Sequence, residues 1–175
     1  ANYRRLGADG FCTWAMNWPF GDAERAIFRE LADPHPAGDK AYFLRRTSTA
    51  TYLQGWDYPA HLPQRLDPAT DVGRAFEIPF AIADEVGTLE GGGPVVTLRL
   101  GLSDLVAADR LALRLNGQSL AGERTRRRPL RQVDPYGGQW LEIDLERVRP
   151  VPGRNRLEIT LLGRPADLVS ALTLE

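Results

Sequence analysis

The sequence has little cysteine and no long apolar run, and each shortage excludes a class of protein. Cys12 is the only cysteine among 175 residues, so no disulfide can form within the chain, and burial of apolar side chains has to stabilise the fold. No apolar run approaches the roughly 20 residues that a membrane-spanning helix needs. We therefore expect no membrane segment. The compartment stays open, with an extracytoplasmic location favoured.

An excess of charge of either sign is also missing. The chain has 22 basic and 23 acidic residues, which gives a formal net charge of -1. This balance argues against a nucleic-acid partner, because affinity for phosphates comes mainly from a surplus of lysine and arginine. Lys40 is the sole lysine, a bias toward arginine that is typical of a GC-rich bacterial genome and has no functional weight.

The motifs of the common catalytic and cofactor sites are missing too. The chain has no Gly-x-Ser-x-Gly nucleophile motif, and Cys12 lies in an apolar run where a small buried side chain is expected. Gly91–Gly93 is not followed by the Lys-Ser/Thr of a phosphate-binding loop, so it predicts a turn. His35 and His61 do not have the spacing of zinc ligands. We assign no catalytic residue and no zinc ligand to this chain.

What the sequence does contain is a persistent alternation of apolar and polar residues in its second half. Residues 111–115, 140–145 and 157–161 each alternate over the length of one strand. Asn116-Gly117 and Pro152–Asn155 supply residue types that tolerate tight reversals of the chain. These segments predict three strands that each bury one face.

Three further segments extend this pattern. Apolar residues alternate in 76–82 and 96–102, and a last strand is expected over 168–174. Short strands at regular intervals, with turn residues between them, are typical of two packed antiparallel sheets. The sequence therefore predicts a mainly β protein, an antiparallel two-sheet β-sandwich.

The order of these elements resembles one known family. A strand ending in Leu-Asn-Gly117 is followed by a strand that opens on Trp140, and Pro152-Gly-x-Asn155 leads into a long strand. This order is similar to that of the galactose-binding-like jelly rolls attached to many glycoside hydrolases. The resemblance implies a carbohydrate-binding type of domain. Because jelly rolls of this kind often hold a structural calcium ion, it also leaves Ca²⁺ open, with loop carboxylates as candidate ligands: Asp67, Asp71, Asp84 and Glu85.

The N-terminal residues resemble a different architecture. A short apolar strand is expected before Asn17, a loop follows, and apolar residues at helical spacing predict a helix over 22–32. Strand, aromatic loop and helix together resemble the last β/α unit of a sugar-cleaving (β/α)₈ barrel, which implies that Trp14, Asn17 and Trp18 line a sugar site. The chain then continues a catalytic barrel in the same polypeptide, and the paired carboxylates of such an enzyme lie outside it.

We accordingly expect three regions. Residues 1–36 form the strand-loop-helix segment, 37–74 form a connector, and 75–175 form the sandwich. The connector is rich in proline and glycine but also in aromatic residues, which are unusual in a solvated linker. We therefore expect it to pack against the sandwich.

The run from Arg124 to Arg131 is the strongest local charge feature, and it admits two interpretations. It is a solvated loop or edge strand whose arginines pair with nearby acids such as Glu142 and Asp144. Alternatively, its arginines, represented by Arg127, donate to sugar hydroxyls or to the carboxylate of an acidic glycan.

Exposed aromatic residues with polar neighbours are the remaining candidates for ligand binding, because sugar rings pack their C–H faces on tryptophan and tyrosine. Trp56 and Tyr58 form one such group, and Tyr136 and Trp140 form another. The structural alternative is that Trp140 covers an end of the sandwich and that Trp56 attaches the connector to it.

Three functions remain open at this point. We favour a non-catalytic accessory module that supports a glycoside-hydrolase barrel and holds glycan near it. The first alternative is the C-terminal part of a glycoside hydrolase whose barrel residues line the sugar site, and the second is a sandwich that binds another protein through an exposed edge strand.

Overall fold

The segments with the strongest apolar alternation form strands of the structure. A computed structural model describes residues 21, 22, 25, 28, 41, 42, 44, 62–87, 93–129 and 138–174. The strands within these residues are β1 (Gln64–Leu66), β2 (Ala75–Ile82), β3 (Thr97–Ser103), β4 (Arg110–Leu115), β5 (Gln118–Ser119), β6 (Arg124–Pro129), β7 (Gln139–Asp144), β8 (Gly153–Gly163) and β9 (Leu172–Leu174).

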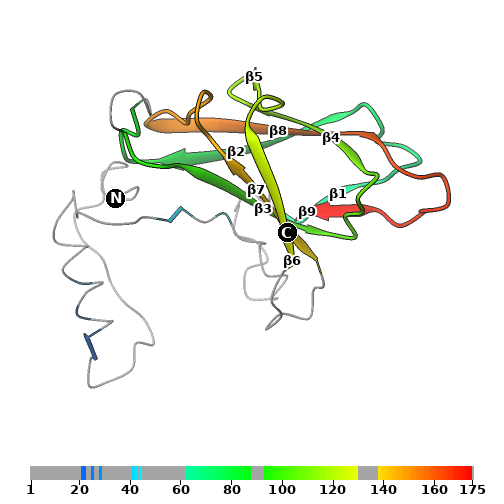
Figure 1. Ribbon diagram of the computed structural model, residues 1–175, viewed down its shortest axis with the longest axis horizontal. Helices are drawn as coiled ribbons and strands as arrows, with labels where there is room; N and C mark the ends of the chain where they lie inside the picture. Colours follow the sequence, from blue (N-terminus) through cyan, green and yellow to red (C-terminus); the bar gives the residue numbers. More distant parts are fainter. Residues whose placement is uncertain are drawn as a thin grey trace, which may run out of the picture.

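These strands build two sheets, and all the pairings are antiparallel. The five-stranded sheet has the order β1-β9-β3-β7-β6, and the four-stranded sheet has the order β2-β8-β4-β5. Figure 1 shows β2, β8 and β4 in the upper layer and β1 and β9 in the lower one. The mainly β fold with two antiparallel sheets that the sequence predicts is therefore confirmed, and the architecture is a β-sandwich.

The core lies between the two sheets. On β8, Asn155, Leu157, Ile159 and Leu161 are buried, whereas Arg154 and Arg156, on either side of Asn155, are exposed. The apolar faces of the other long strands meet them in one continuous buried cluster, which includes Ile78, Leu100, Leu102, Leu115, Leu141 and Ile143. Because side chains alternate along a strand, burying one face leaves the polar face of each sheet outward.

The sandwich also takes in a strand from the segment expected to be the connector. β1 pairs with β9 at the edge of the five-stranded sheet, and Leu66 is fully buried in the core. The final strand is shorter than predicted. β9 begins at Leu172 because the chain turns at Pro165, whose carbonyl accepts a hydrogen bond from the Leu168 amide.

Only a few residues of the predicted N-terminal segments are described. Asp22, Arg25 and Phe28 have helical geometry, and the Arg25 amide donates to the Gly21 carbonyl oxygen at 3.1 Å. These residues do not establish the strand-loop-helix segment, which stays a prediction. In the connector, the Tyr42 hydroxyl bonds to the Asp84 carboxylate beyond the end of β2. Burial, followed by this hydrogen bond, raises the pKa of Tyr42.

Among the described residues, no helix is long and apolar enough to cross a membrane.

Two asparagines explain why Leu-Asn-Gly and Pro-Gly-x-Asn occur together. Asn116 and Gly117 both have positive φ in the turn between β4 and β5, as a two-residue hairpin requires. The Asn116 side-chain amide donates to Asn155 Oδ1 at 2.9 Å, and its own Oδ1 accepts from the Arg156 amide at 2.8 Å. The hairpin turn is thereby attached to the start of β8.

Asn155 fixes the loop on its other side. Its Nδ2 donates to the carbonyl oxygens of Val151 and Gly153 at 2.7 and 3.1 Å, and its Oδ1 accepts from the Val151 amide at 2.8 Å. The residue is only 4% exposed. A buried amide that makes all of these bonds is a structural residue, because any other side chain would leave several partners unsatisfied.

We expect Asn155→Ala to lower the free energy of unfolding by about 2 kcal/mol, because it removes an amide that joins two turns and leaves buried polar groups unpaired. Urea denaturation followed by circular dichroism measures the change. Asn116→Gly is a milder variant, since Asn116 is exposed and glycine tolerates its positive φ. An Asn155→Ala protein as stable as the wild type would contradict this role.

Candidate functional site: a tryptophan and arginine face

The outer face of the five-stranded sheet is strongly polar at its centre. On β7, Leu141 and Ile143 point into the core, so Trp140, Glu142 and Asp144 lie on the outer face. The register of β7 with its neighbours places Gly101 and Arg128 on either side of Trp140, and Arg99 and Arg126 on either side of Glu142. We call these seven residues the Trp140 face: Arg99, Gly101, Arg126, Arg128, Trp140, Glu142 and Asp144.

Glu142 is the centre of the charge on this face. Its side chain is 8% exposed and meets three arginines from the two neighbouring strands. Arg99 Nε lies 3.1 Å from Oε1, while Arg128 Nε and Arg126 Nε lie 3.0 and 3.7 Å from Oε2. Such a buried carboxylate needs these cations, because an unpaired charge at this depth would be strongly unfavourable.

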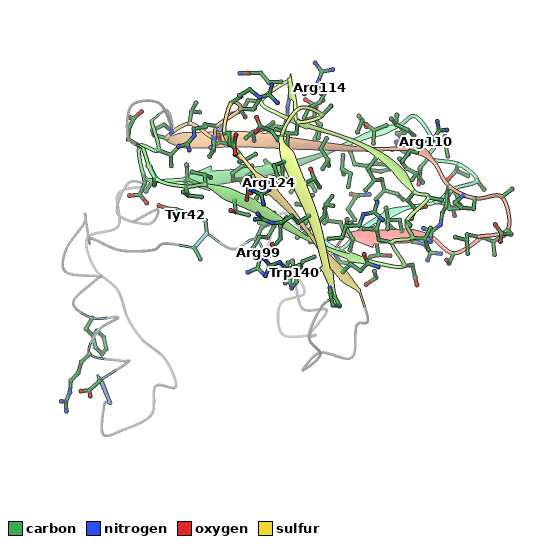
Figure 2. The ribbon with its side chains drawn as sticks, viewed as in Figure 1. Tyr42, Arg99, Arg110, Arg114, Arg124 and Trp140 are labelled. Atoms are coloured by element: carbon green, nitrogen blue, oxygen red, sulfur yellow. The ribbon has the colours of Figure 1, made fainter. Side chains whose placement is uncertain are left out.

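Trp140 is half-buried, and two neighbours on β3 determine how it lies. The ring passes so close to Gly101 that a Cβ there would be 3.3 Å from the ring. A larger residue at this position would displace the ring, which is why a glycine fits here in the middle of a strand. The Arg99 guanidinium carbon is 4.8 Å from the centroid of the Trp140 ring, within cation–π range. Figure 2 shows Arg99 and Trp140 next to each other on the side of β3 that faces away from β8.

Asp144 completes the face at one end. It accepts from Thr97 Oγ1 at 3.2 Å and from Arg126 Nη2 at 2.8 Å. With Arg124, which stands opposite Asp144 in the register, the outer surface of β3, β6 and β7 has four arginines and two carboxylates among the described residues. This part of the surface therefore has a positive local charge on a chain whose net charge is -1.

Residues 124–129 of the arginine run form an edge strand among the described residues, as one of the two interpretations of the sequence expects. β6 is the last strand of its sheet, and Arg126 and Arg128 pair with Glu142 and Asp144. Arg127 lies apart from these residues. It stands opposite Leu141 on the other side of the strand, and its Nη1 donates to the Val106 carbonyl oxygen at 2.8 Å.

The other candidate ligand-binding residues fall outside the described part of the chain, so they stay predictions. These are Trp14, Asn17, Trp18, Trp56, Tyr58 and Tyr136. Of the two predicted ligand-binding residues that the structure describes, Trp140 and Arg127, only Trp140 belongs to the Trp140 face. Gly101 and Arg99 were not predicted, although a glycine inside an alternating strand is a recognisable sign of close packing.

The loop carboxylates considered for calcium have other roles where their contacts are visible. Asp71 Oδ2 accepts from the Asp67 amide at 2.9 Å, and Asp71 Oδ1 is 3.4 Å from Arg74. Across the described residues, no three His, Cys, Asp or Glu side chains come together as a possible metal site. The expectation of a structural Ca²⁺ therefore has no described set of ligands.

Comparison of the chain with protein-family models, with curated proteins and with solved structures gives no significant match.

Proposed function

We propose that this β-sandwich is a non-catalytic carbohydrate-binding module and that the Trp140 face is its binding surface. The observation that supports this most directly is a half-buried tryptophan on a sheet face, seated against Gly101 and bordered by arginines. An indole ring packs on the C–H face of a sugar, while guanidinium groups next to it donate to hydroxyls.

The rigidity of the surface also supports binding. Strands β3, β6 and β7 hold the groups in register, and Glu142 fixes the arginine side chains before any ligand arrives. A surface organised in this way loses little conformational entropy on binding. Sites of this kind are more precise on strands than on loops.

We also propose that the module is accessory to a glycoside-hydrolase barrel in the same polypeptide. The support is the resemblance of residues 1–36 to a final β/α unit, together with the similarity in sequence order between the later strands and the galactose-binding-like jelly rolls. Incubation of the chain with chromogenic glycosides is expected to give no turnover. Turnover by this chain alone would replace the accessory role with an enzymatic one.

We expect Trp140→Ala to lower the affinity for a retained polysaccharide about tenfold, because it removes the stacking surface. Affinity gel electrophoresis over a panel of neutral and acidic polysaccharides identifies the retained one, and titration calorimetry then gives Kd. Trp140→Phe keeps an aromatic ring and is expected to retain most of the affinity.

A second variant tests whether binding depends on the position of the Trp140 ring as well as on its presence. Gly101→Val leaves Trp140 in the sequence but crowds its ring, because a Cβ alone would lie 3.3 Å from it, and it should weaken retention as Trp140→Ala does. Thermal denaturation checks that both variants fold. Failure of the wild-type chain to bind any polysaccharide would contradict the proposed function, and unchanged affinity in Trp140→Ala would exclude this face.

A further inference from the structure

Arg99 and Arg128 of the Trp140 face differ from Arg149 and Arg114 in how many of their guanidinium N–H donors the protein uses. Arg149 donates to Val86 and Pro94 with its two terminal nitrogens, and Arg114 donates to Gly117 with Nε and Nη2. These guanidinium groups hold loops and turns. Arg99 and Arg128 instead make their closest approach to Glu142 with Nε, the nitrogen nearest the backbone.

Their outer ends face the solvent. The Arg99 side chain is 54% exposed and the Arg128 side chain is 62% exposed. Neither one pairs with a second carboxylate among the described residues, since Glu142 is the only acid that each contacts there. Each guanidinium thus has further N–H donors, because the group has five in a planar fork.

The two forks lie close to each other. They contact opposite oxygens of one carboxylate, Arg99 at Oε1 and Arg128 at Oε2. Both also border Trp140, Arg128 as its cross-strand neighbour and Arg99 by the cation–π contact. The single buried charge of Glu142 is shared by three arginines. The positive charge left over next to the Trp140 ring would attract a second anion at the surface.

We infer that the Trp140 face binds a polysaccharide built from uronic acids, with a sugar ring against Trp140 and its carboxylate on the outer N–H groups of Arg99 and Arg128. This inference rests on the proposed function. A planar carboxylate matches the guanidinium fork in two parallel hydrogen bonds, whereas a neutral hydroxyl uses one donor and leaves the excess charge uncompensated.

The test compares one polysaccharide in two charge states. Titration calorimetry with the full chain is expected to show binding of polygalacturonate and about tenfold weaker binding of its fully methyl-esterified form, because esterification removes the anion and keeps the ring. Affinity for polygalacturonate should also fall as salt is raised from low to physiological ionic strength, since the contact is exposed.

Point variants locate the effect. Arg99→Gln and Arg128→Gln should each lower the affinity for polygalacturonate about tenfold and leave that for the methyl ester nearly unchanged. Arg114→Gln is the matched control, because it removes the same charge from the other sheet, and Figure 2 shows Arg114 on the far side of the molecule from Arg99. It should bind as the wild type does.

The outcomes separate this inference from the proposed function. Equal binding of the ester and the acid, or tight binding of a neutral polysaccharide that depends on Trp140, would overturn the uronate inference and leave the proposed function standing. No binding of any polysaccharide would overturn both. Equal affinity for polygalacturonate, dextran sulfate and DNA would overturn the inference, since it would reduce the site to unselective attraction of anions.

Discussion

Asp109→Asn should be the most destabilising single substitution considered for this chain, with an expected loss of about 3–5 kcal/mol of unfolding free energy. Asp109 and Arg164 form an ion pair at 3.6 Å between the β3–β4 and β8–β9 loops, and their side chains are 0% and 1% exposed. Asparagine can still accept the hydrogen bond that the Val106 amide donates to Asp109 at 2.8 Å. The substitution therefore removes the charge and sets an amide NH2 group against Arg164 in place of Oδ1.

The loss arises because Arg164 would remain buried without its counter-charge. Its Nε and Nη1 have no hydrogen-bond acceptor among the described residues, so the Asp109 charge is the main compensation.

Urea denaturation measures the effect. Combining Asp109→Asn with Arg164→Met should recover part of the stability, because both charges are then absent. Glu77→Gln, in an exposed pair with Arg156, is the matched control and should cost under about 1 kcal/mol. If Asp109→Asn lowered the free energy of unfolding as little as Glu77→Gln does, the Asp109–Arg164 pair would not be essential for stability.

Glu123→Gln is expected to cost about 2–4 kcal/mol near neutral pH, and the cost should shrink in acid. The Glu123 side chain is 2% exposed, and its carboxylate accepts hydrogen bonds from three successive backbone amides. Glu146 donates to Oε2 at 2.9 Å, and Arg147 and Val148 donate to Oε1 at 3.1 and 2.9 Å. A glutamine side chain would turn an N–H toward one of these donors.

The pH dependence follows from the direction of the pKa shift. Burial raises the pKa of Glu123, but the amides of Glu146, Val148 and Arg147 and the charge of Arg147 outweigh it, so the pKa is lowered overall. The carboxylate then stabilises the fold fully above the ordinary pKa of glutamate, and this stabilisation is lost as the pH falls through the lowered value.

Denaturation of wild type and Glu123→Gln between pH 7 and about pH 3 measures this difference, because the range spans the ordinary glutamate pKa. The two proteins should become more alike at the acid end. Glu146→Gln removes an exposed carboxylate from the same loop and should show no comparable change. A gap between wild type and Glu123→Gln that stays constant with pH would contradict the shift.

Strands with strong apolar alternation could be located from the sequence because burial of one face imposes a period of two. The segments 111–115 and 140–145 correspond closely to β4 and β7. β6 has no such pattern, because four of its six residues are arginine and the other two are threonine and proline. It is held by register and ion pairs with β7, which depend on residues distant in sequence. β1 and β5 are too short to show a period.

The Trp140 face could be predicted only in part, for a similar reason. Trp140 is conspicuous as an aromatic residue at a strand start, and the pairing of the arginine run with Glu142 and Asp144 follows from proximity along the chain. Arg99 and Gly101 lie on β3, and only the register of β3 with β7 brings them to Trp140. The sequence also does not tell which face of β6 Arg127 occupies, because the arginine run has no apolar alternation to orient it.

The position of β6 at the end of its sheet has a consequence for self-association. In the described part of the chain no strand pairs with the outer edge of β6, and a second copy aligned there would set arginine against arginine along the seam. Like charges placed directly opposite each other destabilise a strand pair. The β6 edges of two copies therefore repel each other, which disfavours edge-to-edge pairing into dimers or fibrils. Proline at position 129 removes one backbone donor from the strand, which further weakens any such pairing.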